Sequence, residues 1–330
     1  MWSFNVRTFP LVVALLAVLL PQFGCEEQFS AKGPYRERMA VYAILTTRSD
    51  TQYVRVYSTY NPPGYDPLAN TSDNQITDAT VTLAKSDSVF SFRDTSVTRT
   101  NKSRYTSDIN MYYSYPLRLK RGTSYHLSVV SPSVGTVTST VTVIPTGVVS
   151  VVNSGEFQQP AIDGKINALV FLGQNAQGYE LRLYLEYSAL INGLVEIRRV
   201  EVPASFQISS DSLHFVEAAY PGIIYRGQSI YMQRDGSETA SFPSLGYITT
   251  VRQLRSQYPD SLKLRKAVFV LSQLDQNLYG YYNVANGFPD SFTLRVDEPD
   301  YTNIDGGVGI LGVLTEDTYT VTIPNNTKIP

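Results

Sequence analysis

The sequence predicts a mainly β protein, in which an N-terminal β-sandwich is followed by a second β-rich domain with one or two short helices. Three observations support this prediction. Apolar and polar residues alternate in many short segments, Gly, Pro and Asx residues separate these segments, and tyrosine is abundant, with 24 copies in 330 residues. Alternation has the period of a strand with one buried face, and aromatic and β-branched side chains favour pleated sheets.

The first half of the chain contains the clearest strands. In the segment QYVRVYS, Val54 and Val56 alternate with Tyr53, Arg55 and Tyr57, which predicts a strand that buries one face. The segments ATVTLA, YHLSVV and GTVTSTVTV alternate in the same way. Several short strands at this spacing favour a sandwich.

Two domains are expected after an N-terminal targeting segment. The first covers residues 37–145 and the second covers residues 146–330, with Pro145 and Gly147 marking the boundary. The chain has one cysteine, so disulfide bonds cannot stabilise either domain. Each domain must therefore be large enough to be stable through apolar burial alone.

The second half mixes strands with helices. The segments YELRLYLEY and LVEIRRVEV are expected to form a hairpin, because Asn192-Gly193 lies between them and is a strong turn signal. A helix is predicted over residues 244–257, with Ser244 as its N-cap, and a shorter one over residues 275–286, ended by Gly287. Two final strands are expected in VGILGVLT and YTVTIP.

Residues 1–24 are predicted to be a lipoprotein signal peptide. The apolar run Leu11–Leu20 follows Arg7 and is too short for a membrane span, but it suits the apolar region of an export signal. The next segment, PQFGC, resembles a bacterial lipoprotein cleavage site. Cys25 is therefore the expected lipidation site, which would attach the protein to a lipid bilayer, and residues 25–36 form a polar tether. The alternative is an ordinary signal peptide in which Cys25 is incidental.

The segment from Gly307 to Gly312 has the spacing G-x-G-x-x-G, which occurs in dinucleotide-binding turns. Such a turn needs a helix after it, but only 18 residues follow Gly312, and they have strand character. We therefore expect strand glycines and no cofactor. Gly306 and Gly307 allow a positive φ or a bulge, while Gly309 and Gly312 leave room for another element to pack closely.

The residue types offer little for catalysis or metal binding. The two histidines, His126 and His214, lie far apart in strand-like segments, and no G-x-S-x-G motif is present. Two histidines and one cysteine make a transition-metal site unexpected. The net charge of −2 argues against nucleic acid as a partner. We expect a protein that is not an enzyme.

An acidic cluster precedes the glycines and comprises Asp297, Glu298, Asp300 and Asp305. Oxygen-rich loops can hold calcium, but this spacing matches no EF-hand loop, so a solvated connection is the expectation. A hydrolase that uses two carboxylates stays open as an alternative, because acids are common and no local pattern selects a pair.

Tyrosine-rich segments are the main indication of ligand binding. Tyr281 and Tyr282, in the segment GYYN, are the candidate binding residues. Such tyrosines either line a groove for a ligand or form ordinary pairs on a sheet surface. Trp2 is the single tryptophan and lies in the signal segment, so the mature chain would lack the residue that sugar platforms commonly use.

Several segments together resemble one family. They are CEEQF, MAVYAILTT, QYVRVYSTY, ITDATVTLA and YPLRLKRGTSYHLSV, followed by LYGYYN and FTLRVDEPDYTNIDGGVGILG. The last two are similar to a Tyr-rich helix and an N-I-x-G-G-x-G-x-F-G run, although Leu311 replaces the usual aromatic residue. The chain resembles Bacteroidota exported lipoproteins of the domain-of-unknown-function 4249 family over most of its length after the signal.

The resemblance implies an immunoglobulin- or transthyretin-like N-terminal sandwich and an outer-membrane lipoprotein on the periplasmic or cell-surface face. Members are often encoded near TonB-dependent outer-membrane receptors, so such a receptor is the expected protein partner. No catalytic residue is implied. We expect a non-enzymatic accessory or ligand-binding component, with a glycan- or peptide-binding module and a carboxylate-based hydrolase as alternatives.

Changing Cys25 to Ala is expected to abolish acylation, because the thiol is the group that receives the lipid. Metabolic labelling with a fatty-acid probe measures this directly, and Ser30→Ala, five residues along the tether, serves as the control that keeps its label. A Cys25→Ala protein that still incorporates the probe would contradict the lipoprotein prediction.

Overall fold

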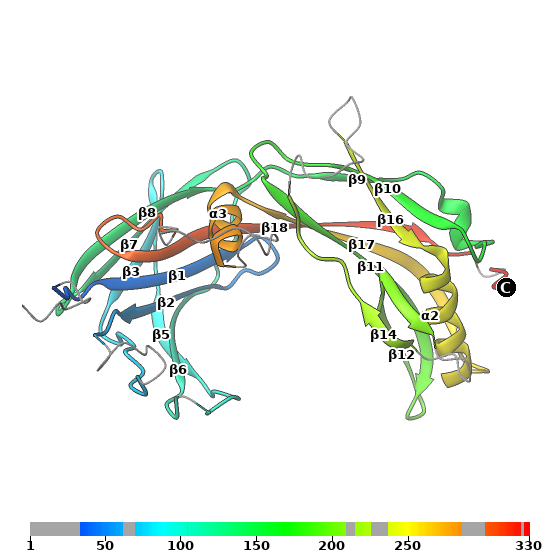
Figure 1. Cartoon of the computed structure of the whole chain (residues 1–330), viewed down its shortest axis with the longest axis horizontal. Coiled ribbons are helices and arrows are strands. Elements are labelled where there is room, and N and C mark those ends of the chain that lie inside the picture. The colour runs from blue at the N-terminus through cyan, green and yellow to red at the C-terminus, as the bar shows by residue number, and fades with distance from the viewer. Residues whose placement is uncertain are drawn as a thin grey trace, which may run out of the picture. The chain divides into compact units, whose positions relative to one another are not determined.

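The structure is a computed structural model that describes residues 34–61, 70–103, 105–208, 215–225, 237–285, 301–324 and 327–330. The chain divides into residues 1–36 and one compact unit over residues 37–330, which is the part considered below. The predicted signal and Cys25 lie outside the described residues. The fold is mainly β, as predicted, and is organised in several sheets (Figure 1).

Two sheets form the N-terminal half. A four-stranded sheet has the order β4-β3-β7-β8, and β1, β2, β6 and β5 continue a larger sheet. Their bounds are β1 Met39–Thr46, β2 Gln52–Ser58, β3 Thr80–Lys85, β4 Ser88–Ser91, β5 Arg93–Val97, β6 Ile109–Ser114, β7 Ser124–Ser131 and β8 Gly135–Thr142. Both sheets contribute to one core, for example through Val41 of β1 and Leu127 of β7. This arrangement is consistent with the sandwich that the family resemblance implies.

The C-terminal half extends the large sheet and adds a three-stranded sheet, β16-β10-β9, and a hairpin, β13-β14. The strand bounds are β9 Val148–Val151, β10 Lys165–Phe171, β11 Gly178–Ile191, β12 Leu194–Val202, β13 Ser205–Ile208, β14 Phe215–Ala219, β15 Ile224–Tyr225, β16 Glu238–Pro243, β17 Lys263–Leu274 and β18 Val308–Thr322. A 3₁₀ helix, η3, covers Ser154–Phe157. The second core includes Phe157, Leu183, Tyr247 and Phe269, and it joins the three-stranded sheet to β11, β17 and a helix.

Strand β18 belongs to both halves. The two expected final strands are one strand of 15 residues, because alternation continues without a turn residue through Thr315. Its first part pairs in parallel with β1, from Ala40↔Val308 to Thr46↔Leu314. Its second part pairs antiparallel with β17, beginning at Leu274↔Leu314. The large sheet therefore runs β12-β11-β17-β18-β1-β2-β6-β5, with β15 beside β11. The predicted boundary at residues 145 and 146 stays a prediction.

The two predicted helices are present. Helix α2 covers Ser244–Gln257 and helix α3 covers Gln276–Ala285; Gly287 lies outside the described residues. The prediction that Ser244 is the N-cap of α2 is wrong, because Pro243 occupies that position and makes no side-chain cap bond. Ser244 is buried as the first helical residue, and its hydroxyl donates to Glu156 Oε2 over 2.8 Å, since that carboxylate lies directly beside it.

The hairpin between β11 and β12 also forms as predicted. Asn192 and Gly193 have φ values of 52° and 82°, which are the positive angles that a two-residue hairpin of this type requires. Neither helix in the described part of the chain has the length and apolarity needed to cross a membrane.

Gly309→Ala is expected to lower the free energy of unfolding by roughly 3 kcal/mol or more, because it combines backbone strain with a steric clash. Gly309 has a φ of +110°, and a Cβ there would lie 2.1 Å from the carbonyl oxygen of Val41 on the paired strand. Chemical denaturation measures the change.

Gly155→Ala is the control for this experiment, because a Cβ at Gly155 meets no atom within 4 Å. Its expected effect is within about 0.5 kcal/mol, as for most surface substitutions. If Gly309→Ala and the wild type have equal free energies of unfolding, the close approach of β18 to β1 does not depend on a glycine at this position, and the prediction is wrong.

Candidate functional site

The outer face of β1 and β2 carries polar and aromatic side chains. The alternation that places Val41 and Val54 in the core turns Tyr42, Arg55 and Tyr57 to the other side of the sheet. Tyr42 and Arg55 are cross-strand partners. Tyr42 and Tyr57 lie diagonally, with ring centroids 6.3 Å apart and an edge-to-face angle of 71°. The strand period therefore groups these side chains on one surface.

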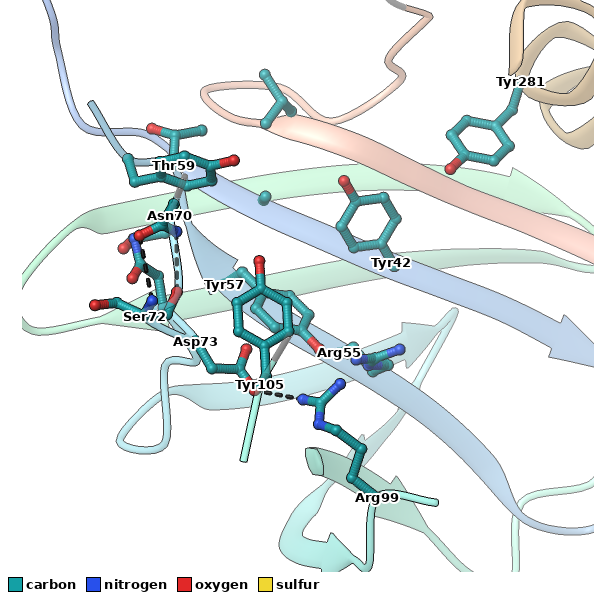
Figure 2. Close-up of a pocket in the computed structure, with 15 residues that line it drawn as sticks. Tyr42, Arg55, Tyr57, Thr59, Asn70, Ser72, Asp73, Arg99, Tyr105 and Tyr281 are labelled. Atoms are coloured by element: carbon teal, nitrogen blue, oxygen red, sulfur yellow. Dashed lines mark hydrogen bonds and ion pairs between the residues drawn. The ribbon is translucent and has the colours of Figure 1, made fainter. Parts of the chain in front are cut away.

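These side chains line a cavity of about 790 Å³. Five tyrosines surround it, together with two arginines, one aspartate and several short polar side chains (Figure 2). The lining residues are Ala40, Tyr42, Arg55, Tyr57, Ser58, Thr59, Tyr60, Asn70, Ser72, Asp73, Asn74, Arg99, Tyr105, Tyr281 and Val308. Cavities of this size and mixed apolar and polar lining are typical of small-molecule sites.

Arg99 is held in a closed network at one end of the cavity. It forms an ion pair with Asp73, and its Nε donates to the carbonyl oxygen of Ser107 over 2.9 Å. The Ser107 hydroxyl donates to the same Asp73 carboxylate over 2.9 Å. The guanidinium also lies over the ring of Tyr105, 5.3 Å from its centroid. Arg99 therefore joins two loops, and its charge is neutralised within the protein.

Arg55 is placed differently. Its guanidinium lies 5.0 Å from the ring centroid of Tyr57 and donates to the Tyr57 hydroxyl. Its Nε is buried and has no hydrogen-bond partner among the described residues, and it forms no ion pair with any carboxylate in that part of the chain. Burial, and to a lesser extent repulsion by Arg99, lowers the pKa of Arg55 from its usual value. It remains charged at neutral pH, because an arginine keeps its proton in proteins.

The glycine-rich segment positions the helix that closes one side of the cavity. A Cβ at Gly312 would lie 2.4 Å from Leu278 Cγ, so the missing side chain lets α3 pack directly on β18. Gly280 of α3 does the same for the ring of Tyr301, whose hydroxyl donates to Asn277 Oδ1 over 2.9 Å. The predicted structural role of the glycines is confirmed, since Gly309 and Gly312 lie within strand β18.

Helix α3 brings one of the two candidate tyrosines to the cavity. Tyr281 lines it, and Figure 2 shows its ring pointing from the helix toward Tyr42. Tyr282 is not among the lining residues and contacts Tyr281 edge-to-face, with centroids 5.8 Å apart. Both pack against the apolar cluster around Leu278. Their role in ligand binding stays a prediction. Of the two, Tyr281 is the one that lines the cavity.

Asp275 immediately precedes α3 and is nearly inaccessible to solvent. Its Oδ1 accepts the backbone N–H of Leu278 over 2.9 Å, which is the geometry of an N-cap. Burial raises the pKa of Asp275 from 3.8 to about 6, although the bond from Leu278 opposes this change. The carboxylate therefore orients the helix that carries Tyr281 and is itself poorly solvated.

Other residues singled out in the sequence lie away from this cavity. His126 is exposed on β7 and its Nδ1 is 3.0 Å from Thr140 Oγ1. Asp305 makes a backbone bridge with Thr138. Within the described ranges, no group of three or more His, Cys, Asp or Glu side chains is placed to hold a metal ion. The residues outside the described ranges are His214, Asp297, Glu298 and Asp300.

Two acids converge on the outer face of β11 and β12. Arg182 contacts Glu180 Oε1 at 2.8 Å and Glu201 Oε2 at 3.4 Å, so it separates the two carboxylates and pairs with both. Desolvation raises the pKa of Glu201. Neither acid lines the tyrosine-rich cavity.

Sequence reasoning did not identify Tyr42, Arg55 or Tyr57 as site residues. The alternation in β2 did indicate that Arg55 and Tyr57 share the face opposite the core. It contained no signal that this face would meet Tyr281, because the contact depends on the packing of α3 against β18.

The fold and the cavity define a class of protein: a mainly β protein with an aromatic, arginine-bearing cavity on the outer face of its largest sheet. The chain belongs to the family described as domain of unknown function (DUF4249), whose sequence profile matches residues 26–320. The curated proteins contain no match to it.

Asp275→Asn is expected to remove a pH-dependent loss of stability. Because the folded-state pKa is raised, the folded protein holds this proton more tightly than the unfolded chain. The contribution of Asp275 to stability is therefore greatest below about pH 4 and falls as the pH rises through about 6. Since one pKa unit corresponds to about 1.4 kcal/mol, the loss is roughly 3 kcal/mol at neutral pH.

Urea denaturation at several pH values tests this, with Asp87→Asn, in the exposed turn between β3 and β4, as the control. Asn keeps an acceptor for the Leu278 N–H, so the cap is preserved. The stability difference between Asp275→Asn and the wild type should grow from about pH 4 to about pH 7. A difference that does not depend on pH would contradict the prediction.

Proposed function

We propose that the protein is a non-catalytic ligand-binding component of the cell envelope, attached to the outer membrane through an acylated Cys25. The observation that carries the proposal is the tyrosine-lined cavity of about 790 Å³. Its size suits a small molecule or a short segment of a polymer. Tyrosines supply large contact areas with few rotatable bonds and therefore a small loss of conformational entropy on binding.

The chemistry of the lining favours binding over catalysis. Among the lining residues that the structure describes, none is His, Cys or Lys, which are common bases and nucleophiles. The carboxylate among these residues, Asp73, is engaged by Arg99 and Ser107. Two-carboxylate hydrolysis needs a second acid across the substrate, and the described lining supplies none.

The resemblance to exported lipoproteins supports the remaining parts of the proposal. A lipid-anchored binding protein beside a TonB-dependent receptor would hold a ligand near the site of its import. The polar tether predicted over residues 25–36 suits this role, because tethering raises the effective concentration of the bound ligand at the receptor.

Tyr281→Ala is expected to weaken ligand binding at least about tenfold, because the change removes an aromatic wall of the cavity. Tyr282→Ala should have a smaller effect, since Tyr282 is not among the lining residues and contacts one of them, Tyr281. Tyr220→Ala is the matched control, because that tyrosine is 49% exposed and does not line the cavity. Calorimetric titration with a panel of acidic and neutral oligosaccharides and peptides measures the affinities.

Two results would contradict the proposed function. One is the absence of binding to every member of the panel. The other is equal binding by the wild type and Tyr281→Ala, which would place the ligand elsewhere. Mass spectrometry of the recovered ligand should show it chemically unchanged, as a non-catalytic protein requires.

A further inference from the structure

We infer that the cavity selects a ligand that carries a carboxylate beside a six-membered ring, with Arg55 as the residue that recognises the carboxylate. The inference rests on the proposed binding function and specifies its ligand. It depends on three observations: the charge balance of the lining, the placement of Arg55, and the distribution of rings and short polar side chains.

The described charged residues of the cavity lining differ in balance from the chain. Among the lining residues that the structure describes, two are arginines and one is an aspartate, whereas the chain as a whole has a net charge of −2. Asp73 forms its ion pair with Arg99 and attracts Arg55 from beyond ion-pair distance. Arg55 is therefore the charged lining residue without an ion pair in the described part of the chain. A positive charge with reduced solvation in a cavity favours an anionic ligand, because the ligand supplies the charge that the protein does not.

Arg55 is also held in a defined orientation. It projects from the middle of β2, and its hydrogen bond to the Tyr57 hydroxyl and its position over the Tyr57 ring restrict the side chain. A guanidinium fixed in this way loses little entropy when a ligand binds, and its planar donors match the two oxygens of a carboxylate. Arg99 shows the contrasting case, in which an arginine of the same cavity pairs with a carboxylate and a carbonyl oxygen of the protein.

The remaining lining indicates a ring. Tyr42, Tyr57 and Tyr281 come from β1, β2 and α3, so aromatic surface borders the cavity on the sheet and on the helix (Figure 2). Short hydroxyl and amide side chains, including Ser58 and Asn74, border it elsewhere. An aromatic ring and the C–H face of a sugar ring both pack against tyrosines, and an aromatic acid and an acidic sugar each carry a carboxylate beside such a ring.

Matched pairs of acids and esters test the inference. The probes are 4-hydroxyphenylacetate and trigalacturonate, each compared with its fully methyl-esterified form, which keeps the ring and removes every negative charge. Calorimetric titration of the full-length protein should show at least about tenfold tighter binding of an acid than of its ester. The pair that shows this preference identifies the ring as aromatic or as a sugar. The preference should shrink between about 0.01 M and about 1 M salt, because salt screens charge attraction.

Arg55→Gln should weaken the binding of the acid at least about tenfold, to an affinity close to that of the ester, and so remove the preference for the acid. Arg55→Lys should retain part of it, since lysine keeps the charge and loses the planar donors. Arg118→Gln is the control: this arginine is 80% exposed, pairs with Asp50 and does not line the cavity, so the variant loses the same charge and should bind like the wild type. If Arg55→Gln does not fold, Arg55→Lys and the salt dependence still decide the outcome.

The outcomes separate this inference from the proposed function. Equal binding of acids and esters, unaffected by Arg55→Gln but lost in Tyr281→Ala, would overturn the inference and leave the binding function intact. An acid preference that persists in Arg55→Gln would also overturn it. If all four probes fail to bind but a neutral member of the wider panel binds, the inferred preference for a carboxylate is overturned and the proposed binding function is not. Failure of every ligand would overturn both.

Discussion

The structure depends on the pairing of β18 along both of its edges. At Leu314 the strand is paired with Thr46 of β1 on one edge and with Leu274 of β17 on the other. Leu311 of β18 is buried in the N-terminal core, and Ile323, which follows its end, is buried in the C-terminal core. Because the strand satisfies backbone donors and acceptors in both halves, neither half has a complete sheet without it. Gly309 permits the close contact with β1 that this arrangement requires.

The candidate site follows from the same strand. Gly312 removes the side chain that would keep α3 away from β18, and the packing of Leu278 into that space brings the helix over the outer face of the sheet. Tyr281 then faces Tyr42 across the cavity. Thus a backbone requirement of the fold, a glycine in a strand, also decides where an aromatic wall of the cavity lies.

The electrostatic character of the cavity comes from a difference between two arginines. Arg99 is surrounded by groups that accept its hydrogen bonds and neutralise its charge, so it stabilises the loops around the cavity. Arg55 is restrained by Tyr57 but lacks a carboxylate partner in the described part of the chain. An ion pair that is complete within the protein contributes to structure, whereas a charge without an internal partner favours an external one. This contrast is the physical basis for proposing an anionic ligand.

The sequence by itself determined the features that depend on near neighbours. The alternation of Val54 and Val56 with Arg55 and Tyr57 predicted the two faces of β2, Asn192-Gly193 predicted the hairpin, and the periodic apolar residues after Pro243 predicted α2. Family membership was also evident from its motifs. Only the tertiary structure decided that β18 pairs with β1, that α3 covers the tyrosine face, and that Arg99 rather than Arg55 pairs with Asp73. These contacts join residues far apart in the chain, and they depend on how whole elements pack, which no local pattern of side chains encodes.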